Sequence, residues 1–260
     1  MTADRELPAG LHSAVVRLAA AEHLLVALDF DGTMSPLVPR PQDARPLPES
    51  ASALAALAAL PGTTTALISG RALASLRLVA GPTTDTLLVG SHGAEVWLGP
   101  GAEPLALDAA QAAALHQTVQ IMEAVAAAHP GTTVEYKPAG AVLHTRQTDE
   151  STGDAAVAAA RGLLAALPGV FLSDGKRVLE AAVVHADKGQ GLALLKEAAG
   201  ATAVFFAGDD VTDEHAFAAL GPADVGVKVG PGDTAAGFRI PSPAGLPPVL
   251  ELLLDERSHR

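Results

Sequence analysis

The chain has 260 residues, of which 49% are hydrophobic and only 3% aromatic, and a formal net charge of -12 at pH 7. This length allows one large domain or two smaller ones, and the negative charge argues against binding to nucleic acid or to an anionic membrane. Because there is no cysteine, disulfides, thiolate metal sites and cysteine nucleophiles are excluded. We find neither a signal-peptide pattern nor an apolar run long enough to span a membrane, so we expect a cytoplasmic protein without membrane contact.

The first hundred residues alternate between expected helices and expected strands. The five apolar residues 24–28 predict a strand that is buried on both faces. A proline-rich loop follows it and is expected to lack regular structure. The other expected elements are a helix ending near 21, a helix at 49–60, a strand at 63–69, a helix from 71, and two short extended segments within 86–98.

From about Leu107 the pattern becomes helix–strand–strand–helix–strand–strand, which is typical of a small α+β insert. Alternation resumes after Asp187 with a helix, a strand, a helix, a strand and a closing helix around 246–254. Strands that alternate with helices predict an α/β fold with a doubly wound, Rossmann-like parallel sheet. We therefore expect an α/β core at residues 1–107 and 184–260, interrupted by an inserted α+β domain at 108–183.

Four polar motifs follow expected strands or open expected helices. They are DFDGT (29–33), SGR (69–71), DKG (187–189) and GDDVTDE (208–214). Taken singly, each is explained by a polar turn or a helix cap. Ligand sites in open α/β sheets form beyond the carboxyl ends of the strands, so the four motifs together indicate one site there.

The side chains of these motifs suit phosphoryl transfer. Carboxylates are the hard oxygen ligands that Mg²⁺ prefers, and four are available: Asp29, Asp31, Asp209 and Asp213. One carboxylate could attack phosphorus once a metal ion offsets the repulsion between the anions. Ser69 and Lys188 could donate hydrogen bonds to phosphoryl oxygens. Because residues i and i+2 of a strand face the same side, Asp29 and Asp31 can serve one site, with Asp31 moving protons.

The motif series resembles the signature of the haloacid dehalogenase (HAD) superfamily, with the insert at the position of a type-2 cap. Together with GSHGAE (90–95) and VEYK (134–137), it is similar to trehalose-6-phosphate phosphatases. The resemblance implies Asp29 as nucleophile, Asp31 as general acid and base, and Ser69 and Lys188 as catalytic phosphate binders. It also implies that Mg²⁺ is the cofactor. The implied metal residues are Asp29, Asp209 and the main-chain carbonyl of Asp31, with Asp213 in support.

Specificity for a sugar is expected in the insert, because a polyhydroxylated substrate needs directional hydrogen bonds. Glu135 and Lys137 share one face of a strand by the two-residue period, and the resemblance implies that they and Glu180 contact the sugar phosphate. His144 and Arg146 are expected to share a face of the next strand, and Lys176 lies near the return to the core. Gly70, Arg71 and His92 are further candidates for substrate contact, on the core side of the expected cleft.

The resemblance predicts hydrolysis of trehalose 6-phosphate to trehalose and phosphate through an aspartyl-phosphate. Three alternatives stay open. The first is a phosphatase for another sugar phosphate, such as sucrose 6-phosphate or mannosyl-3-phosphoglycerate. The others are a catalytically silent regulatory module that binds a sugar phosphate or a synthase partner, and an enzyme that transfers the phosphoryl group to another acceptor, as a mutase does. After Glu180 the chain has Ala181, Ala182 and Val183 where many relatives have an Arg/Lys-Pro step. We expect a monomer with a small-molecule substrate and a trehalose-6-phosphate synthase as the candidate partner.

Overall fold

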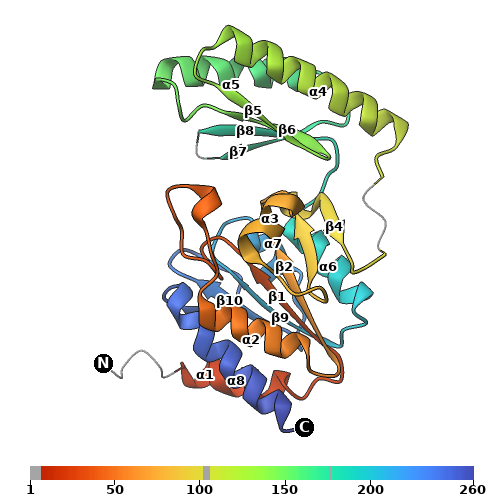
Figure 1. The fold of residues 1–260 in the computed structure, drawn as a ribbon, viewed down its shortest axis with the longest axis vertical. Coiled ribbons are helices and arrows are strands. Elements are labelled where there is room, and N and C mark those ends of the chain that lie inside the picture. Colours follow the sequence, from red (N-terminus) through yellow and green to blue (C-terminus); the bar gives the residue numbers. More distant parts are fainter. Residues whose placement is uncertain (1–6, 102–105, 176) are drawn as a thin grey trace. The chain divides into compact units, whose positions relative to one another are not determined.

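The computed structural model describes residues 7–101, 106–175 and 177–260. The chain divides into two compact units (Figure 1). Residues 1–104 and 186–260 form the core unit, and residues 105–185 form the cap unit. The unit boundaries thus fall after residues 104 and 185, where the sequence predicted them after 107 and 183.

Among the described residues, the core unit has a seven-stranded sheet in the order β11-β10-β9-β1-β2-β3-β4. Its strands run parallel except for β4, which pairs antiparallel with β3. The doubly wound α/β prediction is confirmed. The strands are β1 (Leu24–Asp29), β2 (Thr63–Ile68), β3 (Leu87–Gly90), β4 (Glu95–Trp97), β9 (Ala203–Gly208), β10 (Val225–Val229) and β11 (Phe238–Ile240).

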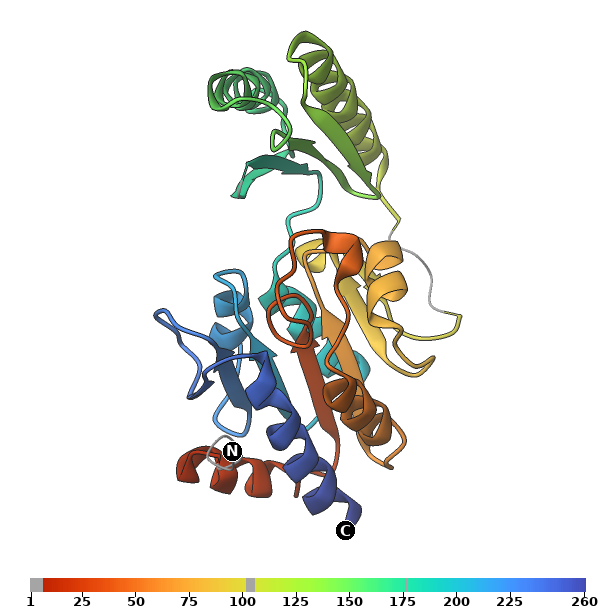
Figure 2. The same cartoon turned by 60° about the vertical axis from the view of Figure 1, so that its left-hand side comes forward.

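Helices cover both faces of this sheet. Apolar residues of α1, α2, α3 and α8 pack on one face and those of α6 and α7 on the other; Figure 2 shows α2 and α8 in front of the strands. The helices are α1 (Ala9–Leu18), α2 (Pro48–Ala58), α3 (Leu73–Ala80), α6 (Lys188–Ala198), α7 (Asp213–Ala218) and α8 (Leu246–Ser258). Because both faces are covered, β1 is apolar from Leu24 to Leu28, and all six of its residues, Asp29 included, are buried.

Among the described residues, four short elements were not predicted. The proline-rich loop, which was expected to lack regular structure, contains a 3-10 helix at Pro41–Asp43, and β11 pairs parallel with β10 at the sheet edge. Two further 3-10 helices lie at Ser91–Gly93 and Pro243–Gly245. None of the helices in the described part of the chain is long and apolar enough to cross a bilayer.

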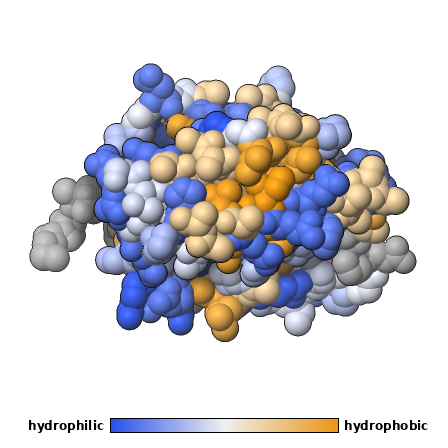
Figure 3. All heavy atoms as spheres, turned by 90° about the horizontal axis from the view of Figure 1, so that it is seen from above, coloured by the Kyte–Doolittle hydropathy of each residue, from blue (hydrophilic) through white to orange (hydrophobic). Residues whose placement is uncertain are grey.

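The cap unit has the helix and strand order predicted for the insert. Its antiparallel sheet, in the order β5-β6-β8-β7, comprises β5 (Thr133–Lys137), β6 (Gly140–His144), β7 (Phe171–Gly175) and β8 (Val178–Ala182). The helices α4 (Ala109–Ala128) and α5 (Glu150–Leu164) cover one face, where apolar side chains from the sheet and both helices form a separate core. Figure 3 looks onto the outer side of these helices, where apolar residues gather between polar ones.

Candidate active site

The central strand β1 carries Asp29 to the carboxyl edge of the core sheet. Asp29 is the last residue of β1, opposite Ile68 of β2, and is 4% exposed. The chain then turns back on itself, because Gly32 N donates to Ser35 O (2.7 Å) and Asp31 bridges to Ser35. This turn follows directly on a buried strand, so the backbone of Asp29 and Asp31 is held at the strand end.

A buried cluster of charges surrounds Asp29. Lys188 Nζ donates to Asp29 Oδ1 (2.7 Å) and to Asp213 Oδ1 (2.6 Å). Asp213 Oδ2 accepts from Asp210 N (2.9 Å). Carboxylate oxygens of Asp29, Asp209 and Asp213 lie within 4.8 Å of one another. Residues far apart in the sequence thus meet at one strand edge, as the motif positions predicted.

Burial shifts the pKa values in this cluster. It raises the pKa of Asp29 well above its usual range, although the ammonium of Lys188 acts in the opposite direction. Burial, together with the charge of Asp213, raises the pKa of Asp209 to about 6. Burial by itself would lower the pKa of Lys188, but the two carboxylates beside it outweigh this and raise its pKa. Three carboxylates therefore share one ammonium, and the cluster is short of positive charge.

The cluster fits a divalent cation by charge, ligand chemistry and shape. A hard cation such as Mg²⁺ binds a few carboxylate oxygens, and here it would supply the missing charge. Gly32 makes room for one of these carboxylates. It adopts a φ of +85°, and a Cβ at this position would lie 2.1 Å from Asp209 Oδ2. Asp29, Asp209 and Asp213 are thus the side chains that could hold the ion.

Ser69 lies beside this cluster, at the end of β2. It is 1% exposed, its N donates to Val89 O (2.9 Å), and its Oγ accepts from Arg71 N (3.2 Å). Ser69 follows Ile68, the residue that pairs with Asp29. Its hydroxyl is therefore held on the strand next to the proposed nucleophile.

Arg71 is bound to Asp31. Its Nε donates to Asp31 Oδ2 (2.5 Å) and its Nη2 to Asp31 Oδ1 (2.6 Å), and its guanidinium carbon lies 5.6 Å from the ring centre of Phe30. Sequence analysis predicted substrate contact for Arg71, which stays a prediction. Because Arg71 binds both oxygens of the Asp31 carboxylate, it orients the group that is expected to transfer protons.

His92 belongs to a strained turn that holds the SGR segment. Ser91 and His92 have φ values of 48° and 56°, in the left-handed region that non-glycine residues rarely adopt. Ser91 N donates to Arg71 O (2.7 Å) and His92 N to Ser69 O (3.0 Å). A Cβ at Gly70 would lie 2.4 Å from His92 Cε1, so a larger residue there would displace the His92 ring.

The predicted cap residues form pairs on one face of the cap sheet. Glu135 binds His144 Nε2 (2.8 Å), and Lys137 Nζ donates to Glu180 Oε1 (2.6 Å). The strand register places all four on the face opposite α4 and α5. Arg146 lies beyond the end of β6, so the prediction that it shares a strand face with His144 is wrong. Lys176 lies outside the described residues.

Two buried charged residues near the site were not predicted. Lys228, 3% exposed, donates to Asp209 O (2.7 Å). Glu95, 7% exposed, accepts from Ser91 Oγ (2.5 Å). The sequence signal for Lys228 was a charge inside a short apolar strand, and Glu95 is the last residue of the GSHGAE motif, to which no role was given.

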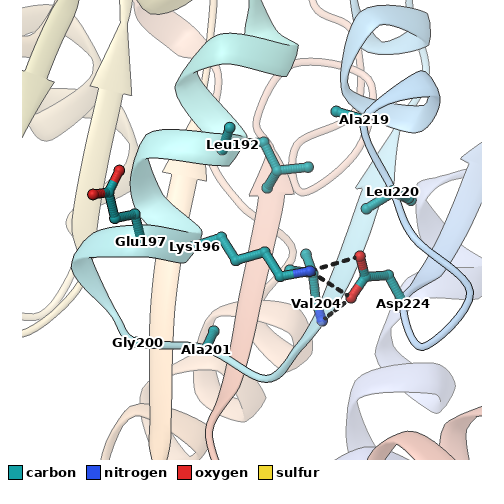
Figure 4. Close-up of a pocket in the computed structure, with 10 residues that line it drawn as sticks. Leu192, Lys196, Glu197, Gly200, Ala201, Val204, Ala219, Leu220 and Asp224 are labelled. Carbon is teal, nitrogen blue, oxygen red and sulfur yellow. Dashed lines mark hydrogen bonds and ion pairs between the residues drawn. The ribbon is translucent and has the colours of Figure 1, made fainter.

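A separate pocket of about 370 Å³ lies elsewhere in the core unit, between α6, β9 and the segment after α7. Figure 4 shows Lys196 reaching across it to Asp224. Val204, which lines it, precedes Gly208 by four residues on β9, or about 13 Å of strand. This pocket is therefore distinct from the acidic cluster.

Comparison with known proteins gives consistent results. A family model described as trehalose-phosphatase matches residues 27–238. The trehalose-6-phosphate phosphatase of Escherichia coli is 33% identical over 225 residues, covering 85% of this chain and 82% of that protein. The bifunctional trehalose-6-phosphate synthase/phosphatase of Thermoproteus tenax is 37% identical over 243 residues, covering 90% of this chain but 32% of the relative. The chain thus spans about a third of that longer protein.

A solved structure supports the fold. The C-terminal domain of the Candida albicans trehalose-6-phosphate phosphatase has a TM-score of 0.76 and 22% identity, covering 94% of this chain and 97% of that one. A structural similarity at 22% sequence identity is evidence for the fold alone. It agrees with an α/β core that carries an inserted cap. The family model matches more than half of the sequence. The chain belongs to the trehalose-phosphatase family.

Proposed function

We propose that the protein is a Mg²⁺-dependent phosphatase that hydrolyses trehalose 6-phosphate through an aspartyl-phosphate. The observation that carries this proposal is the largely buried cluster of Asp29, Lys188, Asp209 and Asp213, with Asp31 two residues after Asp29. A carboxylate at a strand end, an ammonium bound to it and further carboxylates for a cation suit attack on a phosphate monoester.

In the first half-reaction, a carboxylate oxygen of Asp29 forms a bond to phosphorus while the bond from phosphorus to the sugar oxygen breaks. Asp31 donates a proton to the departing sugar oxygen. Lys188 uses two of its three N–H groups for Asp29 and Asp213, and its third N–H and the Ser69 hydroxyl donate to phosphoryl oxygens.

In the second half-reaction, Asp31 takes a proton from water, and the water oxygen attacks phosphorus. The bond between phosphorus and Asp29 breaks, which releases phosphate and restores the carboxylate. Mg²⁺ held by Asp29, Asp209 and Asp213 would supply positive charge that offsets the repulsion between carboxylate and phosphate. The same charge would favour the ionised, nucleophilic form of Asp29, which burial disfavours.

The relatives support trehalose 6-phosphate as the substrate. The E. coli relative is named for that activity, and the T. tenax relative joins a synthase and a phosphatase in one chain. By analogy, this chain would act on the product of such a synthase. The polar face of the cap sheet, with Glu135, Lys137, His144 and Glu180, offers the directional hydrogen bonds that a sugar needs.

Phosphate release from a panel of sugar phosphates tests the proposal. We expect trehalose 6-phosphate to be strongly preferred over glucose 6-phosphate and sucrose 6-phosphate, and EDTA to stop the reaction until Mg²⁺ is restored. Asp29→Asn, which keeps the shape and removes the charge, should lower kcat by about 10³-fold or more.

The matched control is Asp43→Asn, because the Asp43 carboxylate pairs with the exposed Arg40 in the proline-rich loop. This variant should retain wild-type turnover. Equal rates on all three sugar phosphates would overturn the substrate assignment. Full turnover by Asp29→Asn would overturn the mechanism.

A further inference from the structure

Lys228 is a buried cation in a strand of apolar residues. All five residues of β10 are buried, and the Lys228 side chain is 4% exposed. Burying an ammonium is costly unless acceptors surround it. Because Lys228 pairs with Gly208 in the register of β10 and β9, it lies at the carboxyl edge of the sheet. The segment 209–212, which we call the acidic loop, begins immediately after Gly208 and joins β9 to α7.

The ammonium of Lys228 binds the main chain of that loop. Its Nζ donates to Asp209 O (2.7 Å) and to Asp210 O (3.3 Å), and lies 3.4 Å from Glu214 Oε1. The shortest contact is therefore to the carbonyl of Asp209, one of the three carboxylate residues of the cluster. This differs from Lys188, which binds the carboxylates themselves.

Glu214 extends this support to a second segment. Its Oε2 accepts from Ala235 N (2.8 Å) and Thr234 Oγ1 (3.2 Å). On the other side of the loop, Asp213 accepts from Asp210 N. Lys228 thus binds two carbonyls of the acidic loop and Asp213 binds one of its amides, so the main chain of the loop is held on both sides.

We propose that Lys228 is a positioning residue for Asp209. Lys228 holds the main chain of the acidic loop and thereby sets the affinity of the Asp209 carboxylate and its neighbours for the divalent cation. A metal ligand must be held to within about half an ångström of its working position. Without Lys228, two carbonyls at the strand end lose their donor and the loop can move. The inference rests on the proposed function only in taking the cluster as a cation site.

The test is a titration of the metal-free protein with Mg²⁺, in which the unfolding temperature is measured at each Mg²⁺ concentration. This measures binding of the ion without any assay of turnover. Lys228→Met keeps much of the apolar stem and removes the charge and the donors. We expect its Kd for Mg²⁺ to rise by about 10–100-fold, as when a residue that supports a metal ligand is lost. Saturating Mg²⁺ should restore much of kcat.

Lys196→Met is the matched control. Lys196 also pairs with a buried carboxylate of the core unit, Asp224, at 3.0 Å (Figure 4), but it lies at the separate pocket. This variant should unfold at a lower temperature and keep the wild-type Kd for Mg²⁺. It separates general destabilisation from a specific effect on the cation site.

A wild-type Kd for Mg²⁺ in Lys228→Met would overturn the inference, as would an equal rise in Lys196→Met. Should Lys228→Met not fold, Lys228→Gln, which keeps a polar head group, is titrated with the same criterion. If the wild-type protein binds Mg²⁺ but hydrolyses no sugar phosphate, the proposed function fails while a weakened Kd in the variant still supports the role of Lys228.

Discussion

At Gly32, the absence of a single methyl group makes room for the acidic cluster. A Cβ there would overlap the carboxylate of Asp209, at 2.1 Å from Oδ2, and the φ of +85° already disfavours other residues. Because the obstacle is a side chain, the structure would respond by moving that carboxylate. Gly32 therefore controls the geometry of a candidate cation ligand although it has no side chain that could bind a cation.

Gly32→Ala should raise the Kd for Mg²⁺ by about 10-fold or more and lower activity at limiting Mg²⁺. Gly81→Ala is the control, since Gly81 also has a positive φ (+54°) but has no atom within 4 Å of its would-be Cβ. It should cost about 1–2 kcal/mol of folding free energy and leave the Kd unchanged. Equal Kd values for the two variants, measured by thermal shift, would contradict this role.

The raised pKa of Asp209 makes the stability of the metal-free protein depend on pH. Its pKa is about 6 in the folded chain and about 3.9 in an unfolded one. Between these values the folded state binds more protons, so stability falls as the pH rises from about 4 to about 6. Asp29, whose pKa is also raised, acts in the same direction.

In EDTA, Asp209→Asn should therefore unfold at a higher temperature than wild type at pH 7.5, with the difference shrinking at pH 5. Saturating Mg²⁺ should reverse the order at pH 7.5, because only the wild-type carboxylate then gains a cation. Scanning calorimetry at the two pH values measures both effects. A difference in Tm that is independent of pH would argue against the burial of charge as its cause.

The sequence alone predicted which motif residues form the site, but it did not predict the residues that hold them in position. Asp29, Ser69, Lys188 and Asp209 follow strands or open helices in recognisable motifs, so their meeting could be predicted. Lys228 could not, because a single lysine in a short apolar strand is equally typical of a side chain that faces solvent. Only the register with β9 shows that its ammonium reaches the acidic loop.

Among the elements, the cap sheet separates its two faces sharply. Leu143 and Leu179 point toward the helices and form the cap core, while the opposite face carries the pairs Lys137–Glu180 and Glu135–His144. The side chains of Lys137 and Glu180 are only 7% and 17% exposed. Lys137 and Glu180 thus form a largely buried ion pair on this face, while Glu135 and His144 are more exposed.

Lys137→Ala should raise KM for trehalose 6-phosphate by about 10–100-fold, from the loss of a charged hydrogen bond. Hydrolysis of a small aryl phosphate without a sugar should change little. Arg161→Ala is the control, because Arg161 pairs with Asp174 on an exposed part of the cap. If Lys137→Ala weakened both substrates equally, a role in sugar recognition would be refuted.

Element boundaries were predictable where capping chemistry marks them and less so elsewhere. The second helix of the insert was expected from the sequence at residues 154–167. In the structure it begins at Glu150, because Asp149 caps it by accepting from Thr152 N (2.9 Å). The strand β11 has only three residues, and glycine and proline flank it. It exists because the edge of β10 offers it hydrogen bonds, which a local sequence pattern does not record.

On the scale of the whole molecule, the two units have separate apolar cores. A cation that binds the acidic cluster should stabilise the core unit and leave the cap core unaffected. At a concentration of 100 Kd, Mg²⁺ should add about 2.7 kcal/mol to the free energy of unfolding of that unit. Its Tm should therefore rise by about 5–10 °C.

Scanning calorimetry should then show two transitions, of which Mg²⁺ shifts one. A single transition that moves as a whole would mean that the units unfold together. Asp29→Asn gives the comparison, because its transitions should respond less to Mg²⁺.

The distribution of aromatic residues has an optical consequence. The chain has one tryptophan and one tyrosine: Trp97 lies in β4 of the core unit, with Arg77 stacked at 4.3 Å from its ring, and Tyr136 lies in β5 of the cap unit. This chain therefore carries one indole in its core unit and one phenol in its cap unit, and resonance energy transfer from tyrosine to tryptophan would report any change in the distance between these two rings when substrate is added, without any attached dye.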